Sequence, residues 1–132
     1  MDKNIEELVI RHFLRKNRRE RARFELFNEK KRRHFLINIH TKDIFNPHCM
    51  EEIAQSVSSP QVVYDLLTKR GAPSTCYVMR HCSPYDGQIV SLEQGLADLV
   101  FNGPGLISCI HGRLAYMEGE ESARWRVLLM KK

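Results

Sequence analysis

The stretch LISCIHGRLAYME, residues 106–118, decides the fold because two apolar runs flank a turn. Apolar, β-branched and aromatic residues predominate in 106–110 and 113–118, and such residues favour strands. His111 and Gly112 lie between the runs, and glycine accepts the positive φ that a two-residue hairpin turn requires. The sequence therefore predicts an antiparallel hairpin with a two-residue turn.

Two further runs extend this hairpin into a sheet. Residues 124–130 (RWRVLLM) follow a polar turn, so they are expected to return beside the hairpin as a third consecutive strand. Residues 75–80 (TCYVMR) are rich in β-branched and aromatic side chains and are expected to add to the same sheet. We therefore expect a small, mainly antiparallel sheet of about four strands.

Helices are expected in the remainder of the chain. Apolar residues recur at helical spacing, and serine or asparagine followed by proline signals a helix start. The expected helices are 4–16, 18–27, 29–39, 47–55, 60–70 and 92–101. Asn28 offers a helix start, but the sequence leaves open whether the second and third helices are one bent helix. The result is an α+β fold, with a helical N-terminal part (1–55) packed on a mixed part (56–132) that ends in the strands.

Length and composition fit one globular domain over residues 1–132. The chain has 42% hydrophobic and 28% charged residues, a balance typical of folded rather than disordered proteins. Its four cysteines form no CxxC pair, and the acidic N-terminus lacks the basic start and apolar run of an export signal. No stretch approaches the roughly 20 apolar residues that span a bilayer. We expect a cytoplasmic protein with reduced thiols and no membrane segment.

Basic residues are concentrated in the first quarter of the chain. Residues 1–33 hold twelve Lys or Arg and six Asp or Glu, whereas the rest of the chain has nine against ten. Several exposed cations on one surface bind phosphates or carboxylates in a salt-sensitive way. A solvated helix face, partly neutralised by neighbouring glutamates, is the alternative. The predicted partner-binding residues are Arg15, Arg18, Arg19, Arg21, Arg23, Lys30, Lys31, Arg32 and Arg33.

A second group of residues, near predicted strand ends, carries thiol, imidazole and carboxylate side chains. A cysteine nucleophile needs an adjacent base and a cationic setting, and Arg80 and Arg113 lie next to this group in the sequence. The alternative is that the cysteines are core residues, because a two-residue turn pairs Cys109 with Leu114 and turns Cys109 inward. The candidate catalytic residues are His81, Cys82, Asp86, Cys109 and His111.

The sequence contains none of the spacings typical of a metal site or a nucleotide-binding loop. HxxxH and CxxC are absent from it. Gly103-Pro104-Gly105 follows a predicted helix rather than a strand, and it lacks the lysine of a phosphate-binding loop. We expect no metal and no cofactor.

These observations favour a non-enzymatic binding or regulatory module. Its partner is expected to be anionic, either a nucleic acid or an acidic protein, bound by the basic helices. One alternative is a small enzyme that uses Cys82 or Cys109 with His81 or His111. Another is an inhibitor-type or immunity-type protein that docks through the sheet or through the loop 80–88.

Overall fold

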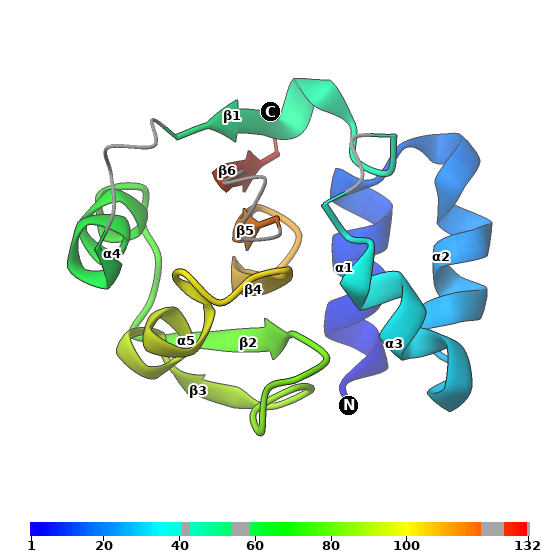
Figure 1. Cartoon of the computed structure of the whole chain (residues 1–132). Helices are drawn as coiled ribbons and strands as arrows, with labels where there is room; N and C mark the ends of the chain where they lie inside the picture. Colours follow the sequence, from blue (N-terminus) through cyan, green and yellow to red (C-terminus); the bar gives the residue numbers. More distant parts are fainter. Residues whose placement is uncertain (41–42, 54–58, 120–125, 132) are drawn as a thin grey trace.

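The computed structural model describes residues 1–40, 43–53, 59–119 and 126–131, and it shows an α+β fold (Figure 1). Within these residues, six strands form one sheet in the order β1-β6-β5-β4-β2-β3, and each neighbouring pair is antiparallel. The strands are β1 (Met50–Glu52), β2 (Thr75–Met79), β3 (Ile89–Ser91), β4 (Gly105–Ile110), β5 (Leu114–Glu118) and β6 (Arg126–Met130).

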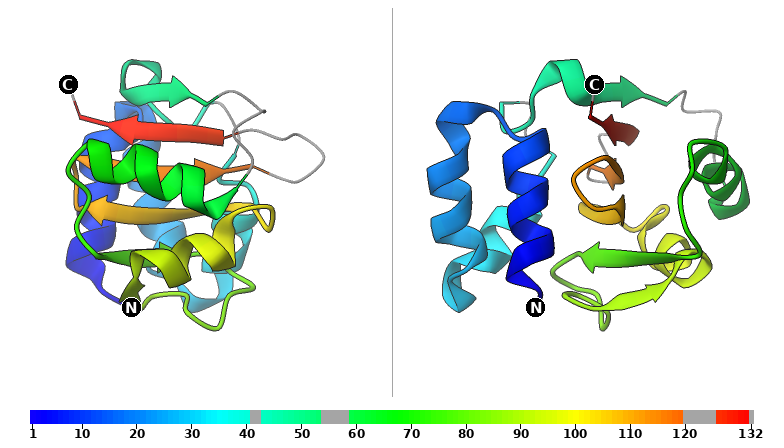
Figure 2. Two further views of the ribbon diagram at one scale, coloured as in Figure 1. Left: turned by 90° about the vertical axis from the view of Figure 1, so that its left-hand side faces the viewer. Right: turned by 180° about the vertical axis from the view of Figure 1, so that it is seen from behind.

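Helices cover both faces of the sheet (Figures 1 and 2). On one side lie α1 (Lys3–Phe13), α2 (Arg19–Leu26) and α3 (Glu29–Ile37), with α1 between the sheet and α2. On the other side lie α4 (Pro60–Lys69) and α5 (Leu92–Leu99). A docking partner would therefore meet helices rather than an open sheet face.

Alternation along the strands supplies an apolar core on each side of the sheet. In β2, Tyr77 and Met79 pack with α1, α2 and α3, whereas Cys76 and Val78 pack with α4 and α5. Burying one large apolar side chain stabilises the fold by about 1.5–3 kcal/mol. The two cores therefore hold both helical layers on the sheet.

Side-chain caps explain where several helices begin. Asn28 has an extended backbone, and its side-chain oxygen accepts hydrogen bonds from the N–H groups of Lys30 and Lys31 at 3.0 and 3.3 Å. The chain turns at this cap, so α2 and α3 are two separate helices. Ser59 and Ser91 cap α4 and α5 in the same way, which confirms the starts that the sequence predicted.

The helix predicted over 47–55 is wrong beyond its first turn. Pro47–Cys49 forms a 3₁₀ turn, η2, after which β1 begins at Met50 and pairs with β6. A short polar segment has little helical stability of its own, so the ladder hydrogen bonds to β6 decide its conformation. With the short edge strands β1 and β3, the sheet has six strands in the described residues rather than about four. Residues 54–55 of the predicted helix, and 124–125 of the predicted last strand, lie outside the described residues.

The hairpin between β4 and β5 has a three-residue turn, so the predicted two-residue turn is wrong. Ile110 rather than Cys109 pairs with Leu114, because the register shifts between Ser108 and Ile110 and leaves Cys109 as an extra residue. Gly112 takes a φ of 81° in the turn, a conformation that glycine adopts without strain. The prediction that Cys109 faces the interior is confirmed.

Candidate anion-binding groove

The nine predicted partner-binding residues do not share one surface, and Arg32 is the clearest exception. Arg32 is only 6% exposed, so its assignment to an exposed binding surface is wrong. It lies three and four residues before the buried Phe35 and Leu36, a spacing that places it on the inward side of α3. The sequence indicated this burial, because Arg32 occupies a position on the same side of α3 as the apolar residues Phe35 and Leu36.

A network of buried carboxylates holds Arg32. Its Nη1 donates to Oε1 of Glu6 at 2.5 Å, and its Nε and Nη2 donate to the carboxylate of Asp86 at 3.1 and 2.9 Å. The Tyr77 hydroxyl donates to Oε2 of Glu6 at 2.6 Å. Burial disfavours the charge of Arg32, but hydrogen bonds from the guanidinium to the two carboxylates raise its pKa, so it stays cationic. The network joins α1, α3, β2 and the loop that follows β2.

Two more of the nine residues, Arg19 and Arg23, are directed toward α1. Arg23 donates from Nε and Nη2 to the two carboxylate oxygens of Glu7, both at 2.7 Å. This hydrogen bonding lowers the pKa of Glu7. Arg19 donates from Nε to the carbonyl oxygen of Leu14 at 3.3 Å. Arg23 fastens α2 to the middle of α1, and Arg19 fastens it to the residue that follows α1.

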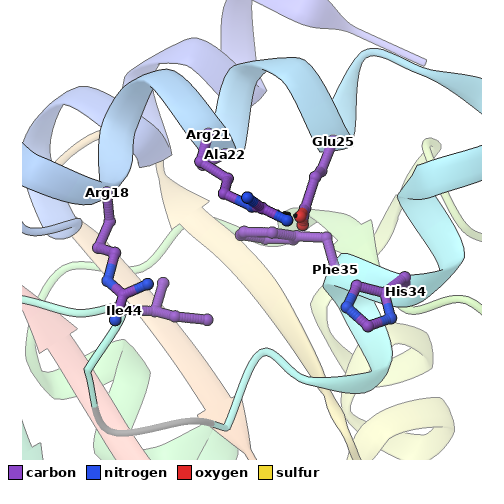
Figure 3. A pocket seen from close by; sticks show the side chains of 7 residues that line it. All are labelled: Arg18, Arg21, Ala22, Glu25, His34, Phe35 and Ile44. Carbon is purple, nitrogen blue, oxygen red and sulfur yellow. Dashed lines mark hydrogen bonds and ion pairs between the residues drawn. The ribbon is translucent and has the colours of Figure 1, made fainter.

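A groove between α2 and α3 gathers other predicted residues (Figure 3). This α2–α3 groove has a volume of about 290 Å³ and is lined by Arg18, Arg21, Ala22, Glu25, His34, Phe35 and Ile44. Ile44 reaches the groove because its carbonyl accepts a hydrogen bond from the backbone N–H of Arg15 at 2.9 Å. That bond holds the segment after α3 beside the residues that precede α2.

The arginines at the groove are only weakly held by the protein's own carboxylates. Arg21 contacts Glu25 at 3.0 Å, but the Arg21 side chain is 77% exposed. Arg18 approaches Asp43 at 3.9 Å, and both side chains are exposed. Exposed ion pairs contribute about 0–1 kcal/mol, so an anionic ligand can replace Asp43 at Arg18 at little cost. Glu25 is buried, so an anion at Arg21 has to bind beside this carboxylate.

Phe24 of α2 and Lys31 of α3 contact each other near the α2–α3 turn, although neither lines the groove. Nζ of Lys31 lies 5.5 Å from the centre of the Phe24 ring, so the two side chains meet across the helix pair. Phe24 follows Arg21 by three residues, and Lys31 precedes His34 by three, so each pair occupies one edge of its helix. One aromatic ring with its cation therefore lies one helical turn from Arg21, outside the residues that line the groove.

Arg15, Lys30 and Arg33 are the remaining predicted residues, and all three are exposed. Arg15 lies at the groove end near Ile44, because of the backbone bond between them. Arg33 lies away from the groove, where its charge acts on His81. The structure thus brings part of the predicted set to the groove and places Arg33 elsewhere.

The five candidate catalytic residues do not converge on one place. Cys109 lies in the core between the sheet and α4 and α5, and burial raises the pKa of its thiol. His111 lies in the β4–β5 turn, where its Nδ1 is 2.7 Å from the Ser108 hydroxyl. Asp86 is paired with Arg32. These three groups are therefore engaged in separate parts of the fold.

The other two candidates, His81 and Cys82, form a thiol–imidazole pair on the loop 80–88. Sγ of Cys82 lies 3.0 Å from Nε2 of His81, and Cys82 is exposed. Burial, and then the charges of Arg33 and Arg80, lower the pKa of His81. The imidazole is therefore neutral at about neutral pH and can accept the thiol proton.

The fold and the groove define an α+β protein with a cationic cleft on one helical layer. Comparison of the chain with protein-family models, with curated proteins and with solved structures found no match. None of the helices in the described residues has the length and apolarity of a membrane-crossing segment. Over the same part of the chain, no three His, Cys, Asp or Glu side chains are grouped so that they could hold a metal ion.

Proposed function

We propose that this protein is a non-enzymatic module that binds an anionic macromolecule in the α2–α3 groove. The observation that carries the proposal is the position of Arg18 and Arg21 at a groove of about 290 Å³, with exposed guanidinium groups. Guanidinium groups bind phosphates and carboxylates in a bidentate manner, which suits them to such a partner.

The balance of charge around the groove supports this proposal. The exposed cations of α2, α3 and the residues just before α2 are Arg15, Lys16, Arg18, Arg21, Lys30, Lys31 and Arg33, whereas the carboxylates there and in the segment after α3 are the exposed Glu20, Glu29 and Asp43 and the buried Glu25, which lines the groove. A surplus of positive charge on one surface attracts polyanions over a distance and accelerates their encounter. The apolar floor of Ala22 and Phe35 excludes water from one side of the arginines, which strengthens their contact with an anion.

Binding of heparin, a polyanion of uniform charge, tests the proposal without assuming a sequence or a fold of the partner. Arg18→Gln and Arg21→Gln each remove one charge from the groove and keep a polar side chain of moderate length. We expect each variant to weaken binding, and each to reduce the slope of log affinity against log salt by about one. Lys69→Gln is the matched control, because it removes an exposed charge at the end of α4, on the opposite side of the sheet.

Two results would contradict the proposal. One is a wild-type protein that does not bind heparin, oligonucleotides or polyglutamate at about 50 mM salt, where electrostatic binding is strong. The other is an equal loss of affinity in Lys69→Gln and in the groove variants, which would show that net charge rather than the groove determines binding.

The contact between Cys82 and His81 favours a second candidate function, a cysteine-dependent reaction on the loop 80–88. An exposed thiol beside a neutral imidazole can transfer its proton and become a nucleophile. If this function holds, Cys82 reacts with iodoacetamide faster than a free cysteine does at neutral pH, and His81→Gln removes the difference. A rate equal to that of a free cysteine would end this candidate function.

A further inference from the structure

Phe24 is a large apolar side chain that the fold leaves in solvent. It is 61% exposed, although it belongs to α2 and has partly buried neighbours. Phe27, three residues later, packs against the core formed by α1, α2, α3 and the sheet. The two phenylalanines therefore differ in role, and the packing of the domain does not explain the exposure of Phe24.

One cation lies over the exposed ring of Phe24, and a second lies one helical turn away. Lys31 lies 5.5 Å from the ring centre, and Arg21 precedes Phe24 by one helical turn on the same edge of α2. Three residues of α-helix rise by roughly 4.5 Å, whereas nucleotides in a stacked strand are spaced by about 3.4 Å. A base on the ring would thus place a phosphate of the same or the next nucleotide near Arg21.

We propose that the anionic partner is a single-stranded nucleic acid, with one base stacked on Phe24 and neighbouring phosphates bound by Arg18 and Arg21. This inference rests on the proposed function and specifies its ligand. Stacking of bases on exposed aromatic rings, with the backbone held by a basic groove, is the way in which single strands are bound without sequence preference, and Phe24 lies one helical turn from Arg21 of the groove. In a duplex the base faces are covered by their neighbours, and the acidic side chains of a protein carry no flat ring, so neither would use Phe24 in this way.

The test compares Phe24→Leu with Phe24→Tyr. Leucine keeps an apolar side chain but has no ring, whereas tyrosine keeps the stacking face. Phe101→Leu is the control, because Phe101 is also exposed, at 46%, and also lies under a cation, the guanidinium of Arg126 at 4.9 Å. It follows α5, which lies on the opposite face of the sheet from α2 and α3 (Figure 1). The probes are a labelled single-stranded oligothymidylate, a DNA duplex of the same length, polyglutamate and heparin.

We expect Phe24→Leu to weaken oligothymidylate binding about fivefold or more, which corresponds to the loss of about 1 kcal/mol or more of base stacking. Phe24→Tyr and Phe101→Leu should bind within about twofold of the wild type, and heparin binding should be unchanged in all three variants, because a sulfated polysaccharide has no base to stack. Thermal unfolding of each variant shows that the groove remains folded.

Several outcomes would overturn the inference and leave the proposed function standing. The first is tighter binding of the duplex or of polyglutamate than of the single strand. The second is a loss of heparin binding in Phe24→Leu as large as its loss of oligothymidylate binding. The third is oligothymidylate binding that Phe24→Leu leaves unchanged. If Arg18→Gln and Arg21→Gln leave heparin binding unchanged, the proposed function fails, and this inference fails with it.

Discussion

Replacing Arg32 with methionine tests whether the buried network holds the first helical layer in place. Methionine keeps an unbranched, flexible stem but has no charge and no N–H donor. In the variant, Glu6, which is 1% exposed, loses the guanidinium opposite it. Asp86 loses both of its hydrogen bonds from Arg32. Two carboxylates then remain without the cation that compensates their charge.

The expected loss of stability follows from how deeply each partner is buried. Removing one partner of a buried ion pair costs about 3–5 kcal/mol, because the other charge stays uncompensated. Glu6 retains the Tyr77 hydroxyl, and water reaches Asp86, whose side chain is 20% exposed, so the lower part of that range applies. A loss of about 3–4 kcal/mol lowers the melting temperature of a domain of this size by roughly 10–15 °C.

Urea unfolding followed by far-ultraviolet circular dichroism measures this loss. Arg33→Met is the matched control, since it makes the same substitution at the adjacent, exposed position and should change stability by no more than about 0.5 kcal/mol. Adding Glu6→Gln to Arg32→Met removes one uncompensated charge, so it should restore part of the loss. Equal stabilities of Arg32→Met and Arg33→Met would refute the reasoning, because the network would then contribute nothing measurable.

Two more predictions concern the core on the α4–α5 side and a buried carboxyl. Gly95→Ala should lower the free energy of unfolding by about 1–3 kcal/mol, because the new Cβ overlaps the Cys76 sulfur. This loss outweighs the better helix propensity of alanine. In a Cys76→Ala background the overlap is absent, so urea unfolding should show no loss from Gly95→Ala. Burial raises the pKa of Glu118 above its ordinary 4.5, although Tyr116 and the Phe101 N–H donate to it at 2.6 and 3.0 Å. Because the folded state holds this proton more tightly than the unfolded state does, Glu118 stabilises the folded wild type below pH 4.5. This stabilisation is lost as pH rises through the raised pKa of the folded state. Glu118→Gln should therefore gain stability relative to the wild type as pH rises from 4.5 through the raised folded pKa, and a difference that does not change with pH above 4.5 would contradict this.

The sequence was sufficient for elements whose signals are local. The caps at Asn28, Ser59 and Ser91 begin helices where they were expected, because a capping side chain acts within one helical turn. Strands β2, β4 and β5 were predicted from composition and alternation. In contrast, β1 has the sequence Met-Glu-Glu, which carries no strand signal, and it exists because β6 pairs with it from the far end of the chain.

The candidate site was less predictable, because it depends on how the helices pack. The basic composition indicated the right layer, but the α2–α3 groove requires the segment at Ile44 to close one side, and that segment is positioned by a backbone bond to Arg15. The burial of Arg32 could have been inferred. Glu6 precedes the buried Val9 and Ile10 by three and four residues, just as Arg32 precedes two buried residues of α3. Opposite charges on two apolar stripes are expected to pair in the interior.

The place of β6 between β1 and β5 has a consequence for biosynthesis. During translation, α1, α2 and α3 emerge early, but β1 has no neighbour to pair with until the ribosome has made residues up to Met130. Until that moment, β5 and β1 each present unpaired backbone groups that can pair with another chain. A nascent chain halted before Arg126 would thus be vulnerable to self-association, and completion of the last strand would pair β5 and one side of β1 at once.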